Sequence, residues 1–385
     1  MKTILFLPQV STRSYTTNSW LLLKSGHIQI MKGQMKAIHK FFPDYKFICL
    51  LPVNTDDEDD WKYDLPDSLK ENIACVQFQL SKNAMFNRYH FDLNNLFLFK
   101  DELSSVDLII SSCPEHNRSL KIFFKYELSK QVDVITTILH YENSFLDAPN
   151  DYFWKVVDGL QCSGLICYNT YELHDILVGT MKDRLNTDRV KEIEKISFVY
   201  NKMMFNEDEL NLNKKDLTKS DKKLILFISR CSDDLRTRLR FFLRSINLLG
   251  GQRNDFKVFI TNPTQVPAEV IKEYIEVTEC DSSIVQFATS GISRKEYIQL
   301  LWQAHVIPIL YDINKNPAVS FYEASYCAKN ILLYTDISEY ILADKLYSIL
   351  DNDSVQYSNK LYAVDNGSCE VHASEFVTEI KTFLS

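Results

Sequence analysis

The sequence predicts an α/β protein of two domains, each built around a parallel β-sheet. Its 385 residues are too many for one typical hydrophobic core and suit two. In both halves, short runs of branched apolar residues alternate with helical patterns, which is typical of doubly wound sheets. Between residues 206 and 223 the composition shifts to Asn, Lys, Asp, Glu and Ser, as in a linker between domains.

The expected elements follow this alternation along the chain. In the first domain we expect strands at residues 3–7, 46–51, 106–111, 132–139, 163–168 and 196–200, with helices at 33–42 and from 171. In the second domain we expect strands at 223–229, 256–261, 285–288, 306–310 and 331–334, with helices between them. The predicted boundaries are 1–206 for the first domain, 207–222 for the linker, 223–371 for the second domain and 372–385 for a closing amphipathic helix.

Composition and charge restrict the class of protein. Apolar residues make up 45% of the chain, as in ordinary globular proteins, and the net charge of −8 argues against a surface that binds nucleic acid throughout. A local basic groove is still compatible with that charge. Nine cysteines without a C-x-x-C pair favour a reducing, cytoplasmic location. The first apolar run is short and ends at Pro8, so it predicts a strand rather than a signal peptide, and we expect no membrane span.

The most informative segment runs from residue 308 to 334 and has the pattern strand, loop, helix, strand. Asn suits a helix N-cap and Pro the first helical position, so Asn316 and Pro317 predict that a helix begins here. A helix N-terminus offers unpaired backbone N–H groups and the positive end of the helix dipole, which together bind a diphosphate. One acidic residue, Glu323, stands inside the helix.

This segment resembles the nucleotide-sugar site of retaining GT-B glycosyltransferases, where a Glu, seven residues and a Glu-Ala pair precede a strand. Glu323 and Ala324 match the second half of that pattern, and Lys315 stands at the first acidic position. The resemblance implies two Rossmann-like domains facing a cleft, a nucleotide-diphosphate sugar as donor, with a UDP-sugar expected, and a last helix that returns to the first domain. It places Glu323 on the ribose hydroxyls of the donor. It places four further residues at the diphosphate: Asn316, Ala318, Val319 and Ser320. The alternative is that Ser320-x-x-Glu323 forms a helix capping box.

Arginines after the first strand of the second domain supply the expected cations. The leaving diphosphate gains negative charge as the glycosidic bond breaks, so cations must neutralise it. Retaining GT-B enzymes place an Arg just after this strand and a Lys a few residues later. Arg230 matches the first position, Arg236 or Arg238 would serve at the second, and with them no metal is strictly required. Alternatively, Arg230 is a salt-bridged loop residue.

Arg236, Arg240 and Arg244 recur every four residues and so share one helix face. This face is either a basic stripe for phosphates or a solvated surface paired with acids.

Two positions in the first domain complete the candidate site. His140 closes a predicted strand, where the resemblance implies a contact with the donor sugar, although lone histidines are more often structural. The turn at Gly26, in the long loop from residue 8 to 32, would present backbone amides to phosphate, and the alternative is a surface flap.

The predicted function is transfer of a sugar from a nucleotide-diphosphate sugar to a hydroxyl acceptor, with retention of configuration. In the front-face mechanism, the leaving diphosphate itself helps to deprotonate the acceptor. The acceptor is a glycan or lipid-linked sugar by default. The chain is also similar to bacteriophage enzymes that glycosylate hydroxymethylated bases in DNA, which would place it in the host cytoplasm. For DNA, a basic track is required. The candidate lysines for that track are Lys214, Lys215, Lys222 and Lys223.

Two other classes of protein share the paired architecture. A sugar-nucleotide epimerase would need catalytic acids and a His, for which Glu115 and His116 are candidates. A non-catalytic protein that binds nucleotides or glycans would account for Lys315 at the acidic position.

Overall fold

The computed structural model divides the chain into two compact units. The first unit holds Met1–Ser11, Trp20–Asn206 and Cys369–Ser385, and the second holds Glu207–Ser368. The residues that the structure describes are 2–10, 20–22, 25–55, 60–83, 88–91, 93–138, 151–169, 174–175, 178–179, 182, 191, 196–214, 222–228, 238–262, 266–311, 318–333, 338–352 and 357–384.

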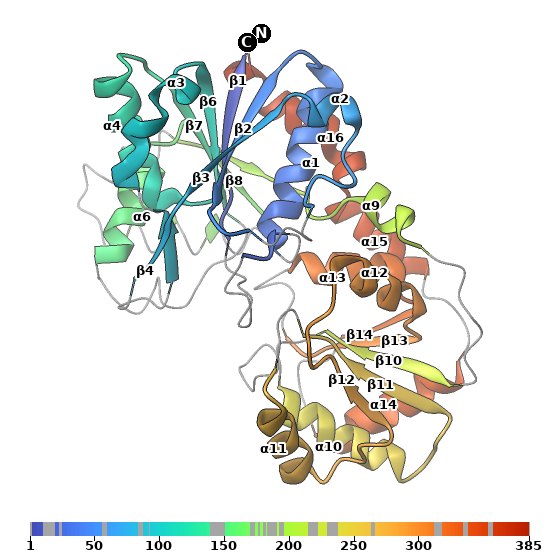
Figure 1. The fold of residues 1–385 in the computed structure, drawn as a ribbon. Coiled ribbons are helices and arrows are strands. Elements are labelled where there is room, and N and C mark those ends of the chain that lie inside the picture. Colours follow the sequence, from blue (N-terminus) through green and yellow to red (C-terminus); the bar gives the residue numbers. More distant parts are fainter. Residues whose placement is uncertain are drawn as a thin grey trace. The chain divides into compact units, whose positions relative to one another are not determined.

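A parallel sheet of seven strands forms the centre of the first unit, in the order β3-β2-β1-β6-β7-β8-β9 (Figure 1). Its strands are β1 (Thr3–Leu7), β2 (Lys46–Pro52), β3 (Ile73–Phe78), β6 (Val106–Ser111), β7 (Asp133–Ile138), β8 (Leu165–Tyr168) and β9 (Ser197–Tyr200). A separate antiparallel pair joins β4 (Leu80–Asn83) to β5 (Arg88–Phe91). The strand order reverses between β1 and β6, as in doubly wound folds.

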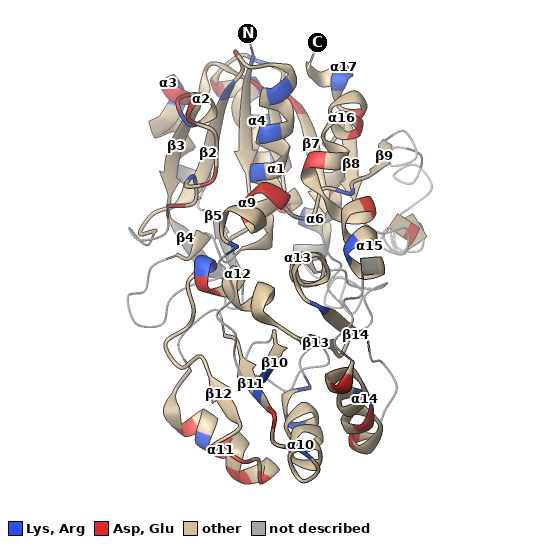
Figure 2. Cartoon of the chain, turned by 90° about the vertical axis from the view of Figure 1, so that its right-hand side faces the viewer, with Lys and Arg blue, Asp and Glu red and all other residues tan. Residues whose placement is uncertain are grey.

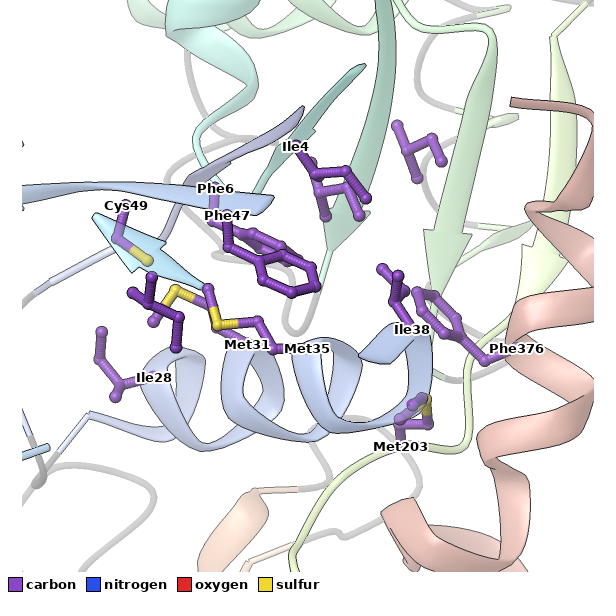
Figure 3. Close-up of a cluster of buried hydrophobic side chains, with 14 of the residues drawn as sticks. Ile4, Phe6, Ile28, Met31, Met35, Ile38, Phe47, Cys49, Met203 and Phe376 are labelled. Atoms are coloured by element: carbon purple, nitrogen blue, oxygen red, sulfur yellow. The ribbon is translucent and has the colours of Figure 1, made fainter. Parts of the chain in front are cut away.

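Helices cover both faces of this sheet (Figure 1). They are α1 (Gly26–Phe41), α2 (Asp67–Lys70), α3 (Lys100–Leu103), α4 (Pro114–Glu127), α6 (Asp151–Gln161), α16 (Cys369–Glu379) and α17 (Lys381–Leu384), with a 3-10 helix at Leu93–Phe99. Alternate residues of β1 serve the two faces: Ile4 and Phe6 pack with α1, whereas Leu5 and Leu7 pack with α4. Figure 3 shows the first of these cores, in which Met31 and Met35 of α1 meet Phe6 and Phe47 of the sheet.

The C-terminal segment packs on the first helix of the chain. A Cβ added at Gly33 of α1 would lie 2.3 Å from Sγ of Cys369, at the start of α16. Gly33 is therefore a point of close helix approach, and the prediction that a helix begins there is wrong because α1 starts at Gly26. Close to the chain ends, Lys2 Nζ donates to the Phe383 carbonyl at 3.2 Å.

The second unit contains a parallel sheet of five strands in the order β12-β11-β10-β13-β14 (Figure 1). Its strands are β10 (Lys223–Phe227), β11 (Phe256–Ile260), β12 (Val285–Phe287), β13 (Val306–Ile309) and β14 (Asn330–Leu333). Its helices are α9 (Glu207–Leu212), α10 (Leu239–Gly250), α11 (Ala268–Thr278), α12 (Arg294–Gln303), α13 (Val319–Cys327), α14 (Glu339–Asp351) and α15 (Tyr357–Gly367). Since α9 lies in the segment predicted as a linker, that segment begins with a helix of the second unit.

The two parallel sheets with their helices confirm the predicted α/β class. Within the described part of the chain, no helix combines the length and the apolar character that crossing a membrane requires.

Candidate functional site

The candidate site lies at the carboxyl edge of the sheet in the second unit. Strands β10 and β13 are neighbours there, and the chain leaves them toward opposite sides of the sheet, to β11 and to β14. In open α/β sheets, ligands bind outside the carboxyl ends of the strands at such a switch point. The helices that follow β10 and β13 are α10 and α13. Their N-termini therefore begin at this edge.

Helix α13 starts later than the sequence predicts. Val319 is its first residue and Ala318, with extended backbone, is its N-cap, whereas Asn316 lies outside the described residues. The alternative that Ser320 and Glu323 form a capping box is wrong. Ser320 lies inside the helix, and no side chain caps α13. Ala318, Val319 and Ser320 thus form the N-terminus of α13, where the diphosphate is expected.

Glu323 takes part in a buried ion network that joins three helices. Arg294, the first residue of α12, holds the Glu323 carboxylate with Nη2–Oε1 at 2.6 Å and Nη1–Oε2 at 3.1 Å. The same guanidinium holds Glu209 of α9, with Nη2–Oε2 at 2.7 Å and Nε–Oε1 at 3.2 Å. The three side chains are 8% exposed at most. The planar guanidinium thus orients both carboxylates by two hydrogen bonds each.

The network contains two carboxylates and one guanidinium. Burial alone would lower the pKa of Arg294, but Glu209 and Glu323 raise it well above its usual value. Each carboxylate oxygen of Glu323 accepts one hydrogen bond from Arg294, and a carboxylate has about four acceptor sites. Glu323 therefore keeps further acceptor capacity while Arg294 holds it in place.

A tyrosine beside the network supplies a neutral hydroxyl. Burial, followed by the negative charge of Glu323, raises the pKa of Tyr297 well above its usual value, and Arg294 partly opposes this shift. The Tyr297 hydroxyl is buried and has no hydrogen-bond partner among the described residues. Because a buried hydroxyl is costly to leave unpaired, a further partner for this group is expected.

The N-terminus of α10 carries one of the predicted cations. Arg238 is its N-cap and has left-handed backbone, with φ 46° and ψ 45°. An N-cap is usually extended, and left-handed backbone costs a non-glycine residue roughly 1–3 kcal/mol. Strained backbone of this kind clusters at active sites and ligand clamps, although Asn54, Ser129 and Glu279 also have positive φ. The other two predicted cations, Arg230 and Arg236, lie outside the described residues.

The rest of the arginine stripe is paired with acids. Arg240 lies 3.3 Å from Glu273, and Arg244 lies 3.5 Å from Glu339. These pairs fit a solvated helix face. Figure 2 colours the basic and acidic residues along α10, α11 and α14.

Two of the lysines proposed for a DNA track also have partners. Lys214 Nζ faces the Trp302 ring at 4.3 Å, and Lys223 Nζ donates to the Leu350 carbonyl. Lys215 lies outside the described residues.

In the first unit, the structure describes one of the two predicted site residues. Gly26 is the first residue of α1, which follows β1 at the switch point of that sheet. The N-cap Ser25 does not cap the helix, because its hydroxyl donates to the Gln9 carbonyl at 3.1 Å. The N-terminus of α1 therefore lacks a side-chain cap. His140 lies outside the described residues, and His116, the epimerase candidate, is buried in α4.

Sequence reasoning missed Arg294 and Glu209. Glu209 stands in the segment predicted as a linker, and Arg294 stands in one of the helices expected between the strands of the second domain. A weak signal was present, because a basic residue in the first helical turn opposes the helix dipole. Such a residue requires a compensating partner, which here is a pair of carboxylates.

No group of three or more His, Cys, Asp and Glu side chains within the described segments has the arrangement of a metal site.

Three solved structures show what this fold resembles. HepE from Anabaena, in complex with UDP and glucose, superposes with a TM-score of 0.65 at 11% identity, covering 99% of this chain and 100% of that one. A UDP-forming α,α-trehalose-phosphate synthase from Burkholderia vietnamiensis gives 0.62 at 12% identity, covering 100% of both chains. A Listeria monocytogenes protein described as a UDP-N-acetylglucosamine 2-epimerase gives 0.62 at 10% identity, covering 100% and 97%.

No protein-family model and no curated protein sequence matches this chain. At 10–12% identity, the structural likeness establishes the fold. The chain therefore has the GT-B fold and resembles glycosyltransferases built on it.

Proposed function

We propose that this protein is a retaining glycosyltransferase that takes its sugar from a UDP-sugar. One observation carries the proposal. The N-termini of α10 and α13 lie at the switch point of the sheet, and neither has a side-chain cap or an acidic residue in its first turn. Such N-termini attract a diphosphate through their unpaired N–H groups and dipoles. Solved structures of HepE in complex with UDP, and with UDP and glucose, support a uridine nucleotide.

The residues of the second unit take distinct roles in this proposal. Glu323, held by Arg294, accepts hydrogen bonds from the ribose hydroxyls. Arg230, together with Arg236 or Arg238, neutralises the diphosphate as it leaves. The leaving diphosphate helps to deprotonate the acceptor, so no protein nucleophile is required. The acceptor in this proposal is a hydroxyl group of a glycan or lipid-linked sugar.

Calorimetric titration with UDP, GDP, ADP, TDP and CMP tests the donor site. We expect UDP to bind most tightly. Glu323→Gln should weaken the affinity for UDP at least tenfold, since hydrogen bonds to a charged group contribute about 1.5–3 kcal/mol each. The matched control is Glu296→Gln, because Glu296 lies in the same unit but serves the capping box of α12.

Absence of binding by every nucleotide, or equal UDP binding by Glu323→Gln and the wild type, would reject the site. Sugar transfer is then measured with UDP-glucose and hydroxyl acceptors, including a duplex with hydroxymethylcytosine. If only the duplex is glycosylated, the acceptor is DNA rather than a glycan or lipid-linked sugar.

A further inference from the structure

Two cysteines of the first unit face each other across neighbouring strands. Cys49 in β2 and Cys75 in β3 are directly opposite in the parallel register. Neighbouring strands lie about 4.8 Å apart, within the range of roughly 4.4–6.8 Å that disulfides require between Cα atoms. In parallel strands, residues directly opposite each other project their side chains from the same face of the sheet, so the two thiols are neighbours. The backbone spacing between the two residues is therefore one that a disulfide can span.

The two thiols have unlike surroundings. Cys49 is buried, and burial raises its pKa well above the usual value. Cys75 is exposed, and its pKa is lowered to about 7, mainly by the hydrogen bond from Cys49 and also by Lys62, while partial burial opposes the shift. Near neutral pH, about half of the Cys75 population is thiolate, which is the reactive form.

Lys62 is held in position to act on Cys75. Its ammonium group donates to the Ile73 carbonyl of the same strand at 3.5 Å and lies 5.5 Å from the centre of the Trp61 ring. Its positive charge is one of the causes that lower the pKa of Cys75. Lys62 and Cys49 are the titratable groups that act on Cys75.

The other cysteines lack this combination. Cys75 is the exposed one among the eight cysteines that the structure describes. Burial raises the pKa of Cys162, and it raises the pKa of Cys167 to about 12 and that of Cys280 to about 11. An exposed thiol with a lowered pKa beside a buried partner thiol is the arrangement of a peroxide-reactive pair.

We propose that Cys49 and Cys75 form a reversible oxidation site, which hydroperoxides convert to a disulfide between β2 and β3. The Cys75 thiolate attacks one peroxide oxygen, so that an S–O bond forms, the O–O bond breaks and the leaving oxygen takes a proton. Cys49 then attacks the Cys75 sulfenic acid; the S–S bond forms, the S–O bond breaks, and hydroxide leaves as water with the Cys49 proton. Two thiols lose two electrons and hydrogen peroxide becomes two waters.

The test is to titrate the intact protein with hydrogen peroxide and map its peptides by mass spectrometry without reduction. We expect a Cys49–Cys75 linked peptide that appears before any oxidation of Cys162 and disappears with a thiol reductant. If Cys75 reaches sulfinic acid while Cys49 stays reduced, or if no linked peptide forms, the proposal is overturned.

Variants separate the two steps. Cys49→Ser should accumulate a Cys75 sulfenic acid that dimedone traps, and the matched control Cys162→Ser should form the disulfide as the wild type does. Lys62→Gln should slow alkylation of Cys75 by iodoacetamide near pH 7, with the difference vanishing near pH 10, where Cys75 is ionised in the variant and in the wild type. An equal alkylation rate of Cys75 and Cys162 in the wild type near pH 7 would also overturn it. None of these measurements depends on the proposed sugar transfer.

Discussion

Within the second unit, helices α12 and α14 close their N-termini with a side chain, whereas α10 and α13 at the switch point do not. Ser293 and Ser338 cap α12 and α14 by accepting from backbone N–H groups, and each helix has an acid in its first turn. Helices α10 and α13 have neither feature, although all four belong to the same unit. Since capping contributes about 1 kcal/mol, its omission at the switch point is a local loss of stability. The difference locates where an anion would complete the structure.

The two kinds of helix are linked through Arg294. Helix α12 has its own cap, so its first side chain is available to hold Glu323 of α13. The ion network therefore fixes the helix that its own sequence leaves uncapped. Three predictions test this division of roles.

The largest effect is expected from Arg294→Met. Removing the guanidinium leaves Glu209 and Glu323 buried side by side without a cation, so unfolding should become easier by about 3–5 kcal/mol. Glu323→Gln should cost much less stability, because Arg294 still forms its ion pair with Glu209. Urea unfolding of both variants measures this order. Equal stabilities for Arg294→Met and the wild type would show that the network does not hold α13.

The next effect is expected from Ala318→Asp at the open N-terminus of α13. The new side chain should cap the helix and raise stability by about 1 kcal/mol. Its charge should also repel a diphosphate and so weaken the affinity for UDP tenfold or more. Ala318→Asn is the matched control, since it caps without charge and should bind UDP more tightly than Ala318→Asp. If the Asp and Asn variants bind UDP equally, the N-terminus of α13 does not hold the diphosphate.

The sequence predicted the alternation of strands and helices well, because buried parallel strands appear as continuous apolar runs. It missed β3, an edge strand in which only Ile73, Val76 and Phe78 are buried, so that it forms no such run. It misplaced the start of α1 because the reason for Gly33 lies in α16, far away in the chain.

The candidate site was predictable only where its signal is local. Glu323 stands in a recognisable strand–loop–helix pattern, and Arg238 follows β10 within a short distance along the chain. The partners of Glu323 come from other helices, and Arg294 lies 29 residues from Glu323 and 85 from Glu209. No local pattern records a pairing over such separations, since only the packed fold brings the three side chains together.

The smallest effect on stability is expected from Arg238, whose backbone is left-handed at the open N-terminus of α10. Arg238→Gly should remove that strain and raise stability by up to about 1 kcal/mol, whereas Arg238→Ala should not, because alanine resists positive φ. Both variants lack the cation, so both should lose sugar transfer while retaining most UDP affinity. Thermal unfolding and turnover with UDP-glucose measure the two effects separately. Both variants lose the cation, and Arg238→Gly alone also relieves the backbone strain. Full turnover by Arg238→Gly would therefore mean that Arg238 has no part in the departure of the diphosphate.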